Sequence, residues 1–404
     1  PFQNLKGCNA MKVVQINVTC GSGSTGKICV AVSDLLSMRD IENYILFSSG
    51  ETKHPQGHRY MSHLEIKLQA LQSRIFGNYG FNSRGATKRI IKILERIEPD
   101  VVHLHNLHGH NCNLELLFSY LREKKIKIYW TFHDCWAFTG YCPHYDMIGC
   151  EKWKTGCENC PQYRRFSWFF DRSHFLYEKK KAALSDLDLT IITPSQWMAN
   201  QVKQSFLNRY EIKVIHNGID LSVFHPRQSD FRKKYHCEDK FVLLGVAFDW
   251  SYRKGLDVFQ ELAERLDERF QIVLVGTNDK IDQQLHQRII SIHRTQNQQE
   301  LAEIYSAADL FLNPTREENY PTVNMEAIAC GTPVVTFDTG GSAEMLYNAC
   351  GIVVAKNDIE SLQAAIETVY MHQPAYQEKC IQYSHRFVAA DRFKEYVALY
   401  EKEN

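Results

Sequence analysis

The sequence predicts an α/β protein with two Rossmann-like domains that face each other across a cleft. Short β-branched runs alternate with longer helical patterns, and this alternation occurs in two successive series. Strands that alternate with helical segments are typical of βαβ units and a parallel sheet. The length of 404 residues suits one to three domains. Two such domains leave a ligand-binding cleft between them.

The first series is expected to form an N-terminal domain over residues 11–223. Its strands are expected at 12–18, 43–49, 100–105, 127–133, 189–195 and 212–218. Helical patterns such as GKICVAVSDLLSM and GATKRIIKILERI lie between them. Residues 1–10 lack a signal-peptide pattern, and we interpret them as a tag remnant or an upstream extension outside the fold.

The second series is expected to form a C-terminal domain over residues 224–382. Its strands are expected at 240–248, 271–277 and 332–337, with a short one at SIHRT and another at LFLNPT. The polar segment 224–240 contains a proline and is expected to link the two series. Residues 383–404 are expected to form a helix that packs back on the N-terminal domain.

The composition narrows the class of partner. Lys and Arg number 47, as do Asp and Glu, so no global charge favours nucleic acid. No apolar run reaches the ~18 residues of a membrane span. Thirteen cysteines without a secretion signal are expected to be reduced thiols or metal ligands. We therefore expect a cytoplasmic protein that does not bind nucleic acid.

The stretch TREENYPTVNMEAIACGTPVV, residues 315–335, is the most informative. Glu318 and Glu326 are eight residues apart, and Pro321 between them suits the first turn of a helix. The free N–H groups of that helix would form an anion site between two carboxylates that can accept sugar hydroxyls. The alternative is a solvated helix with two ordinary acids.

The loop GSGSTG, residues 21–26, matches two phosphate-binding patterns at once. With Lys27 it resembles a nucleoside-triphosphate loop, but Ile28 stands where that loop needs Ser or Thr. Its three glycines fit the dinucleotide pattern, but that pattern also needs an acid at the end of the second strand. The chain reads FSSG there, and Glu51 comes only after it. A tight strand-to-helix turn without a ligand is a third interpretation.

The 315–335 stretch resembles the E-x7-E signature of the retaining glycosyltransferases of family 4, which have the GT-B fold. The segments VIHNGIDLSVFHP, YRKGLDVFQELAERL and GTPVVTFDTGGSAEML resemble further family motifs in the expected order. The block HDCWAFTGYCPHYDMIGCEKWKTGCENCPQ, residues 133–162, is similar to one in the colanic-acid and capsule glycosyltransferases of that family. The resemblance covers nearly the whole chain from Met11.

This resemblance implies a retaining, metal-independent transfer of a sugar from a UDP- or GDP-linked donor. The acceptor would be a glycan or a lipid-linked molecule in capsule, exopolysaccharide or O-antigen synthesis, at the inner face of the cytoplasmic membrane. An epimerase or hydrolase acting on nucleotide sugars, and a non-catalytic subunit that binds them, are the alternatives.

The resemblance also assigns residues to the donor. These are Gly23, Arg253, Lys254, His293, Arg294, Glu318, Asn319, Tyr320, Pro321, Thr322 and Glu326. Arg253 and Lys254 would hold the diphosphate, Glu326 the ribose and Glu318 the sugar, with the nucleobase near residues 293–296. The catalytic roles would fall on His133, Arg253, Lys254 and Glu318.

On the acceptor side the resemblance points to Gly21, Ser22, Gly23, Ser24, Thr25, His105 and Asp134. The glycine-rich loop would then face the cleft, near the donor phosphate and the acceptor. We call residues 318–322 the donor arm. Two departures from the family pattern lie in it: Asn319 and Pro321 stand where the family has glycines. A third is Asp249, where the family often has arginine.

Three further clusters are left with alternatives. The histidines of HLHNLHGHN are His103, His105, His108 and His110, which would bind a metal, line the acceptor side or simply pack. Cys142, Cys150, Cys157 and Cys160 lie in an insertion at about 135–162 and would bind a structural zinc, remain free or form disulfides. The run 163–181 mixes aromatic and basic residues and suits an anionic membrane surface, or else a partly buried helix with solvated lysines.

Overall fold

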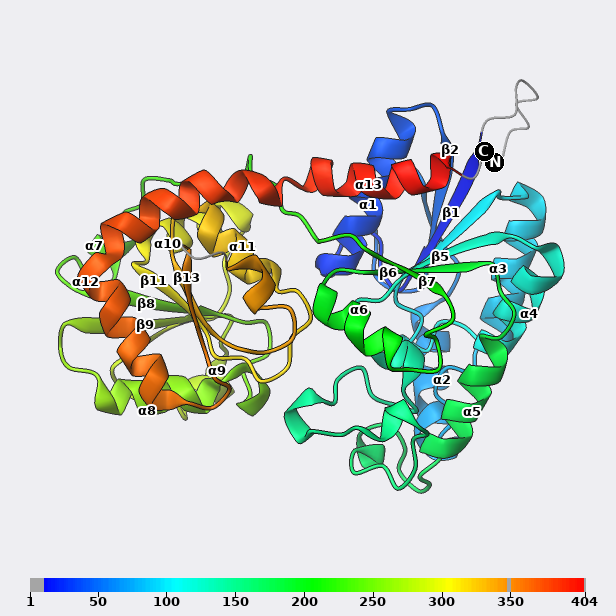
Figure 1. Ribbon diagram of the computed structural model, residues 1–404, viewed down its shortest axis with the longest axis horizontal. Helices are drawn as coiled ribbons and strands as arrows, with labels where there is room; N and C mark the ends of the chain where they lie inside the picture. Colours follow the sequence, from blue (N-terminus) through cyan, green and yellow to red (C-terminus); the bar gives the residue numbers. More distant parts are fainter. Residues whose placement is uncertain (1–10, 347–349, 403–404) are drawn as a thin grey trace.

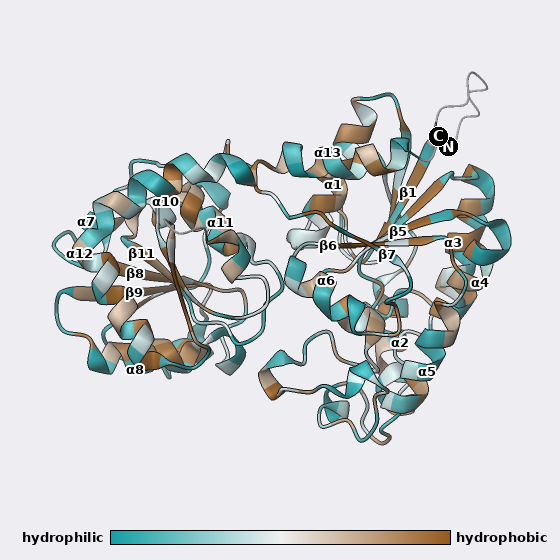
Figure 2. Ribbon diagram, in the orientation of Figure 1, coloured by the Kyte–Doolittle hydropathy of each residue, from teal (hydrophilic) through white to brown (hydrophobic). Residues whose placement is uncertain are grey.

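The computed structural model describes residues 11–346 and 350–402, and our interpretation of residues 1–10 lies outside them. Figure 1 shows two lobes side by side, each with a parallel sheet at its centre. In Figure 2 the strands form the hydrophobic interior and the outer helices are more hydrophilic. This arrangement confirms the predicted fold class of two Rossmann-like domains.

The N-terminal sheet has seven parallel strands in the order β3-β2-β1-β4-β5-β6-β7. The strands are β1 (Lys12–Asn17), β2 (Glu42–Phe47), β3 (Gly57–Arg59), β4 (Val101–Leu104), β5 (Lys127–Thr131), β6 (Leu189–Thr193) and β7 (Glu211–Val214). The helices are α1 (Gly23–Ser37), α2 (His63–Phe76), α3 (Arg84–Ile97), α4 (Leu114–Lys124), α5 (Ser173–Ala183) and α6 (Gln196–Lys203). The strand order reverses between β1 and β4, which is where ligands bind beyond the carboxyl ends of such sheets.

The C-terminal sheet has six parallel strands in the order β10-β9-β8-β11-β12-β13. They are β8 (Phe241–Val246), β9 (Phe270–Val275), β10 (Ile289–Ile292), β11 (Leu310–Asn313), β12 (Val334–Phe337) and β13 (Gly351–Val354). The helices are α7 (Phe231–Lys234), α8 (Leu256–Arg265), α9 (Asp279–Asp282), α10 (Gln298–Ala307), α11 (Thr322–Ala329) and α12 (Ile359–Ser384). The two sheets therefore have the same order about their central strands.

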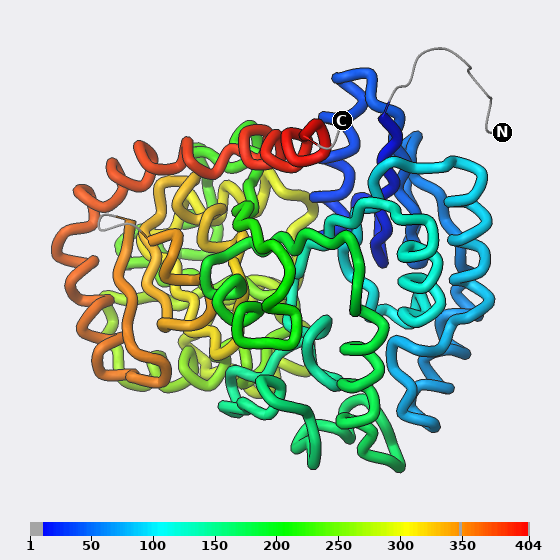
Figure 3. The backbone as a smooth tube through the Cα atoms, turned by 45° about the vertical axis from the view of Figure 1, so that its right-hand side comes forward, coloured from blue at the N-terminus to red at the C-terminus, as the bar shows by residue number. Residues whose placement is uncertain are grey.

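The last helix, α13 (Ala389–Glu401), packs against α1 of the N-terminal domain, as Figures 1 and 3 show. Phe393, Tyr396, Val397 and Tyr400 are buried there in one cluster with Val32 of α1. The chain therefore crosses between the domains a second time, after α12.

The first crossing comes earlier than the sequence predicts. Ile215 is buried in the N-terminal core and Ile219 in the C-terminal core. Phe224 and Phe231, which lie in the expected linker 224–240, are also buried in the C-terminal core. Their apolar contacts place that segment inside the C-terminal domain, so the boundary lies a few residues before 223–224.

The two crossings lie side by side and the domains also touch elsewhere. Ile219 pairs with Val388 in an isolated β-bridge, next to the second crossing. The Glu344 carboxylate accepts hydrogen bonds from the backbone N–H groups of Gln196 (2.7 Å) and Trp197 (2.6 Å) at the N-terminus of α6. A carboxylate is favoured there because the unpaired N–H groups carry partial positive charge.

A long insertion connects β5 to α5. Its regular structure is limited to four short 3₁₀ helices: η1 (Trp136–Phe138), η2 (Asp146–Ile148), η3 (Lys152–Lys154) and η4 (Tyr163–Arg165). Trp136, Phe138 and Trp153 are nearly fully buried and give it an aromatic core. The insertion extends beyond the predicted 135–162, because irregular backbone continues to the start of α5.

Candidate functional site

The candidate site is a cleft between the two domains, with about 1030 Å³ of open space. The N-terminal wall consists of Ser24, Thr25, Ile28, His133, Pro194 and Asn217. The C-terminal wall consists of Val246, Ala247, Phe248, Asp249, Arg253, Lys254, Glu318, Asn319, Tyr320, Pro321, Thr322 and Val323. Residues far apart in the sequence thus meet here, as the resemblance implies.

The segment between β11 and α11 carries Glu318 into the cleft. Pro321 is the N-cap of α11 rather than a residue of its first turn, and its own φ of −74° leads into the helix. The eight residues of α11 therefore direct free N–H groups toward the cleft, beside Glu318. The spacing of the two glutamates predicts a helix N-terminus at this place, and anion binding there stays a prediction.

Lys254 and Glu318 form an ion pair, with Nζ 2.6 Å from Oε2. Burial alone would raise the pKa of Glu318, but the charge and hydrogen bond of Lys254 outweigh it, so this pKa lies below its usual range. Lys254 ends η5 (Tyr252–Lys254), directly before α8. Glu318 is therefore ionised near pH 7, and the ion pair fixes its carboxylate beside η5.

Arg253 makes no ion pair or side-chain hydrogen bond in the part of the chain that the structure describes. Its backbone carbonyl accepts a hydrogen bond from the Arg316 N–H at 2.9 Å. The Arg316 guanidinium binds both oxygens of Asp257 at 2.8 Å and lies 3.8 Å from the Tyr252 ring centroid. Arg316 thereby holds the loop that presents Arg253, a support that no sequence motif indicated.

Glu326 lies inside α11 and is partly buried. Burial raises the pKa of this carboxyl to about 7, against the opposing effects of a hydrogen bond from Tyr305 and the charge of Lys27. The Tyr305 hydroxyl donates to Oε2 at 3.2 Å. Lys27 follows the glycine-rich loop, so its charge acts on Glu326 from the N-terminal domain, although Glu326 is not among the residues that line the cleft described above.

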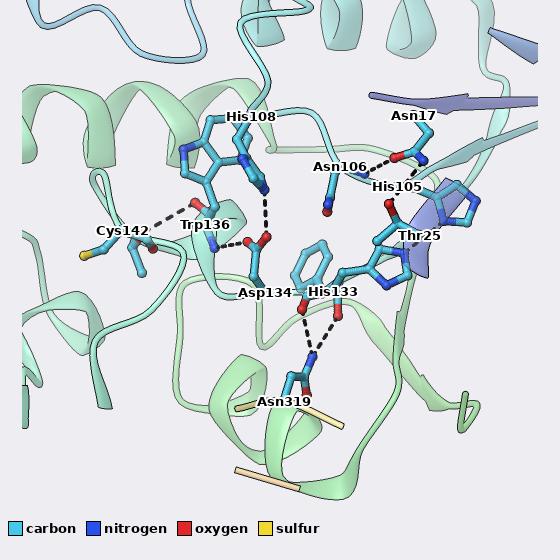
Figure 4. A network of polar contacts seen from close by, with 12 residues as sticks. Asn17, Thr25, His105, Asn106, His108, His133, Asp134, Trp136, Cys142 and Asn319 are labelled. Carbon is cyan, nitrogen blue, oxygen red and sulfur yellow. Dashed lines mark hydrogen bonds and ion pairs between the residues drawn. The ribbon is translucent and has the colours of Figure 1, made fainter. Parts of the chain in front are cut away.

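Asn319 joins the donor arm to the N-terminal domain, as Figure 4 shows. Its Nδ2 donates to the carbonyls of Phe132 (3.4 Å) and His133 (3.2 Å), and its Oδ1 accepts from Ser195 Oγ at 2.7 Å. A glycine has no side chain for these bonds. The departure from the family pattern at this position therefore creates an interdomain contact.

Tyr320 is nearly buried and stacks on His216 in the first crossing, with ring centroids 4.9 Å apart. The donor arm therefore contacts both the neighbouring domain and the segment that connects the domains.

His133 faces the cleft from the segment after β5. Its Nε2 lies 3.1 Å from Nδ1 of His105, whose Nε2 lies 3.2 Å from Oε1 of Gln15. Burial lowers the pKa of His133 to about 4, and the pKa of His105 also falls well below its usual value. Both rings are thus neutral near pH 7, and His105 orients His133 rather than lining the cleft.

Asp134 turns away from His133 and pairs with His108, Oδ2 to Nε2, at 2.7 Å (Figure 4). Its Oδ1 accepts from the Trp136 N–H at 2.9 Å. Burial alone would raise the pKa of Asp134, but His108 holds it below its usual range. Asp134 therefore supports the insertion and does not line the cleft described above.

The glycine-rich loop lies between β1 and α1. Ser24 and Thr25 line the cleft, and Asn17 Nδ2 donates to Thr25 Oγ1 at 3.3 Å. Gly21 and Gly23 have positive φ angles of 79° and 67°, which glycine adopts readily. Ser22 is the N-cap of α1, and a side chain at Gly23 would meet nothing within 4 Å. The loop thus presents a helix N-terminus on the open side of the cleft.

His293 and Arg294 follow β10, are exposed, and do not line the cleft described above. His293 Nε2 lies 2.6 Å from Oδ2 of Asp282, whose hydrogen bond raises the pKa of His293. Their contact with the nucleobase stays a prediction.

The remaining histidines of HLHNLHGHN pack within the N-terminal domain. His103 lies 2.8 Å from Thr131 Oγ1 and 2.6 Å from the Tyr400 hydroxyl, and His110 lies 3.1 Å from Ser73 Oγ. Within residues 11–346 and 350–402, the three residues whose metal-ligating atoms lie within 4.8 Å of one another are Asp279, Asp282 and His293. The histidine cluster is therefore not a metal site of that kind.

Asn217 in the first crossing is a lining residue that our site prediction omitted. It is 9% exposed, and its Oδ1 is buried without a hydrogen-bond partner among the described residues. The segment VIHNGID, already noted as a family motif, was the signal that could have identified it.

The comparisons with known proteins agree with this geometry. The family model described as Glycosyltransferase Family 4 matches residues 28–223, and that described as Glycosyl transferases group 1 matches residues 238–372. An Escherichia coli K12 protein, provisionally named the colanic acid biosynthesis glycosyl transferase WcaC, is 23% identical over 412 residues. The match spans 97% of this chain and 100% of that one.

Solved structures are similar at the level of the fold. Anabaena HepE in complex with UDP and glucose matches with a TM-score of 0.70 at 15% identity, over 97% of this chain and 100% of that one. WaaG, a glycosyltransferase involved in lipopolysaccharide biosynthesis, matches with a TM-score of 0.65 at 17% identity, over 96% and 99%.

Two parallel-sheet domains around this cleft define the GT-B fold. The chain belongs to glycosyltransferase family 4.

Proposed function

We propose that the protein transfers a sugar from a UDP-linked donor to a glycan or lipid-linked acceptor in polysaccharide synthesis, with retention of configuration and without a catalytic metal. The observation that carries the proposal is the cationic C-terminal wall, where Arg253, Lys254 and the N-terminus of α11 face His133. Structures of the similar HepE with UDP and with UDP-glucose support the choice of UDP. The names of WcaC and WaaG support polysaccharide synthesis.

In this proposal the donor lies along the C-terminal wall. Arg253, Lys254 and the N–H groups of α11 bind the diphosphate, and Glu326 accepts hydrogen bonds from the ribose. Because Lys254 is paired with Glu318 at 2.6 Å, the diphosphate shares this cation while Glu318 contacts the sugar. Charge placed where the leaving diphosphate develops its own charge lowers the barrier to transfer.

The acceptor hydroxyl approaches from the N-terminal wall, on the same face as the leaving phosphate. The bond from the anomeric carbon to the phosphate oxygen breaks as the bond to the acceptor oxygen forms, and the acceptor proton passes to that phosphate oxygen. No protein nucleophile is needed. His133, neutral because burial lowers its pKa to about 4, hydrogen-bonds the sugar without competing with the cations for the diphosphate.

The test is transfer from radiolabelled UDP-sugars to a lipid extract or to defined glycans, with product configuration determined by NMR. Arg253→Ala should lower kcat/KM about 10- to 100-fold, as expected for loss of a charge-assisted hydrogen bond. Arg265→Ala, an exposed arginine of α8, is the matched control. Donor consumption that does not depend on an acceptor would favour a hydrolase or epimerase, and an inverted product would exclude retention.

We also propose that the acceptor is presented at an anionic membrane surface. No helix in the described ranges is long and apolar enough to cross a membrane. Exposed apolar side chains gather instead on α2 and before α5: Leu64, Leu68, Leu71, Phe76, Trp168, Phe169 and Phe170. The two segments are adjacent, since Trp168 N–H donates to the Arg74 carbonyl at 2.8 Å. Exposed Arg164 and Arg165 add positive charge beside this apolar surface.

Vesicle sedimentation tests this surface directly. The protein should bind vesicles rich in phosphatidylglycerol, and Trp168→Ser with Phe169→Ser should weaken binding about tenfold. Met371→Ser, which removes an exposed apolar side chain from α12, is the control. Equal binding of the double variant and its parent would exclude this surface. The other interpretation of the run 163–181 was a partly buried helix with solvated lysines. At Lys180 that expectation is wrong, because this lysine is fully buried.

A further inference from the structure

We propose that the insertion between β5 and α5 is a zinc site, with one Zn²⁺ bound by the thiolates of Cys142, Cys150, Cys157 and Cys160. All four cysteines line one small cavity in the insertion, and none of them is in a disulfide. Four thiolates are a standard ligand set for structural zinc. This site is separate from the cleft and is not used in the proposed transfer.

One backbone donor in the insertion is already directed at a cysteine sulfur. The Gly140 N–H donates to Cys157 Sγ at 3.2 Å. Donors aimed at sulfur stabilise the negative charge that a metal ligand carries.

A buried cation lies beside the cluster. Lys180 is fully buried, and Nζ donates to the carbonyls of Trp136 (2.6 Å) and Thr139 (2.9 Å). No carboxylate lies within ion-pair distance of it in the described part of the chain, and burial lowers the pKa of Lys180 to about 7. The charged form of a buried lysine is favoured by an anionic partner. Zn²⁺ with four thiolates carries two negative charges and would supply such a partner.

The insertion also has a structural need for a cross-link. It has no helix longer than three residues and no strand, and most of its backbone hydrogen bonds close local turns. Metal binding supplies folding free energy in such segments. Among the described residues, the metal-ligating atoms that lie within 4.8 Å of one another belong to Asp279, Asp282 and His293. The four cysteine sulfurs are not grouped this closely, so they must move closer together to share one ion.

The insertion touches the C-terminal domain next to the donor arm. The Met147 N–H donates to Glu317 Oε1 at 3.0 Å, and Lys356 Nζ lies 2.8 Å from Asp146 Oδ2. Glu317 directly precedes Glu318. We infer that zinc, by fixing η2, holds the two walls of the cleft at their working separation; this second step rests on the proposed function, whereas zinc binding does not.

The first experiment measures metal in the full-length protein, purified without chelators or nickel columns. Elemental analysis should find about one zinc per chain, and a mercurial should release it in parallel with thiol modification. Cys142→Ser and Cys160→Ser should each lose most of it, whereas Cys237→Ser, at a buried cysteine of the C-terminal core, should keep it. Co²⁺ substituted into the parent protein should give thiolate-to-cobalt absorption typical of tetrahedral sites.

Three results would overturn the proposal: protein without zinc and without cobalt absorption, disulfides among the four cysteines in mass spectra, or full zinc content in both cysteine variants. Should those variants be insoluble, the mercurial and cobalt measurements on the parent still decide. Asp146→Ala tests the second step separately: zinc content should stay at about one per chain while KM for the donor rises several-fold. Unchanged KM would reject the role at the cleft and leave the zinc site standing.

Discussion

At Glu326 the proposed function and the stability of the fold make opposite demands, because the proposed ribose contact uses the ionised carboxylate and burial disfavours it. Burial raises its pKa to about 7 from the ordinary 4.5. The folded state then binds this proton more tightly than the unfolded state does. Folding is therefore favoured at low pH, and this contribution is lost as the pH rises through about 7. At 1.36 kcal/mol per pH unit, the ionised carboxylate lowers the free energy of unfolding by up to about 3 kcal/mol above pH 7.

The substitution Glu326→Gln removes the charge and keeps an oxygen for the Tyr305 hydroxyl. At about pH 8 it should raise the free energy of unfolding by up to about 3 kcal/mol, and at about pH 4.5 the gain should vanish. UDP binding should behave in the opposite way: the parent should bind more weakly as pH falls below about 7, and the variant should bind weakly throughout.

Urea unfolding at a series of pH values and calorimetric titration with UDP measure the two quantities. Glu264→Gln, at an exposed carboxyl of α8, should change neither. A variant that is destabilised at pH 8, or stabilised equally at both ends of the series, would refute the assignment of a raised pKa to Glu326. Unchanged UDP affinity would refute its contact with ribose.

Three other substitutions test the support of the donor arm. Asn319→Gly restores the family residue but removes three interdomain hydrogen bonds, so thermal unfolding should show a loss of about 1–3 kcal/mol and steady-state kinetics a higher donor KM. Arg316→Ala should release the loop of Arg253 and lower kcat/KM about tenfold with little change in overall fold by circular dichroism. Gly340→Ala should abolish donor binding by calorimetry, because its Cβ would lie 1.9 Å from the Glu318 carbonyl oxygen at a φ of 57°.

The sequence allowed much of the fold to be predicted because the strands of a parallel sheet are covered on both faces. The β8 segment FVLLGV is almost continuously apolar and is buried along nearly its whole length. The strand β3, GHR, has only three residues at the sheet edge and no hydrophobic signal. The helix α2 keeps Leu64, Leu68 and Leu71 exposed, so its pattern did not distinguish a buried face.

The site, like the fold, could be predicted from the sequence only in part. Arg253, Lys254 and Glu318 lie in short motifs whose spacing along the chain is fixed, and they meet in the cleft as predicted. His105 and Asp134 were expected to line the acceptor side, but each hydrogen-bonds a neighbouring histidine instead. Such choices depend on side-chain packing between strands, which the spacing of residues along the chain does not determine.

The contacts of the donor arm suggest why a family 4 enzyme can replace its glycine with Asn319. The backbone carbonyl of Asn319 accepts from the Gly341 N–H at 2.6 Å, while its side chain bonds Ser195 and His133 of the other domain. Asn319 therefore shapes the loop that carries Glu318, and the position of this loop depends on the position of the N-terminal domain. With Glu344 bound to the N-terminus of α6 nearby, the geometry of the donor arm depends on domain closure. In the proposed mechanism, an arm set in this way would align Glu318 with the sugar only when the acceptor wall is in place, and this would limit hydrolysis of the donor while the cleft is open.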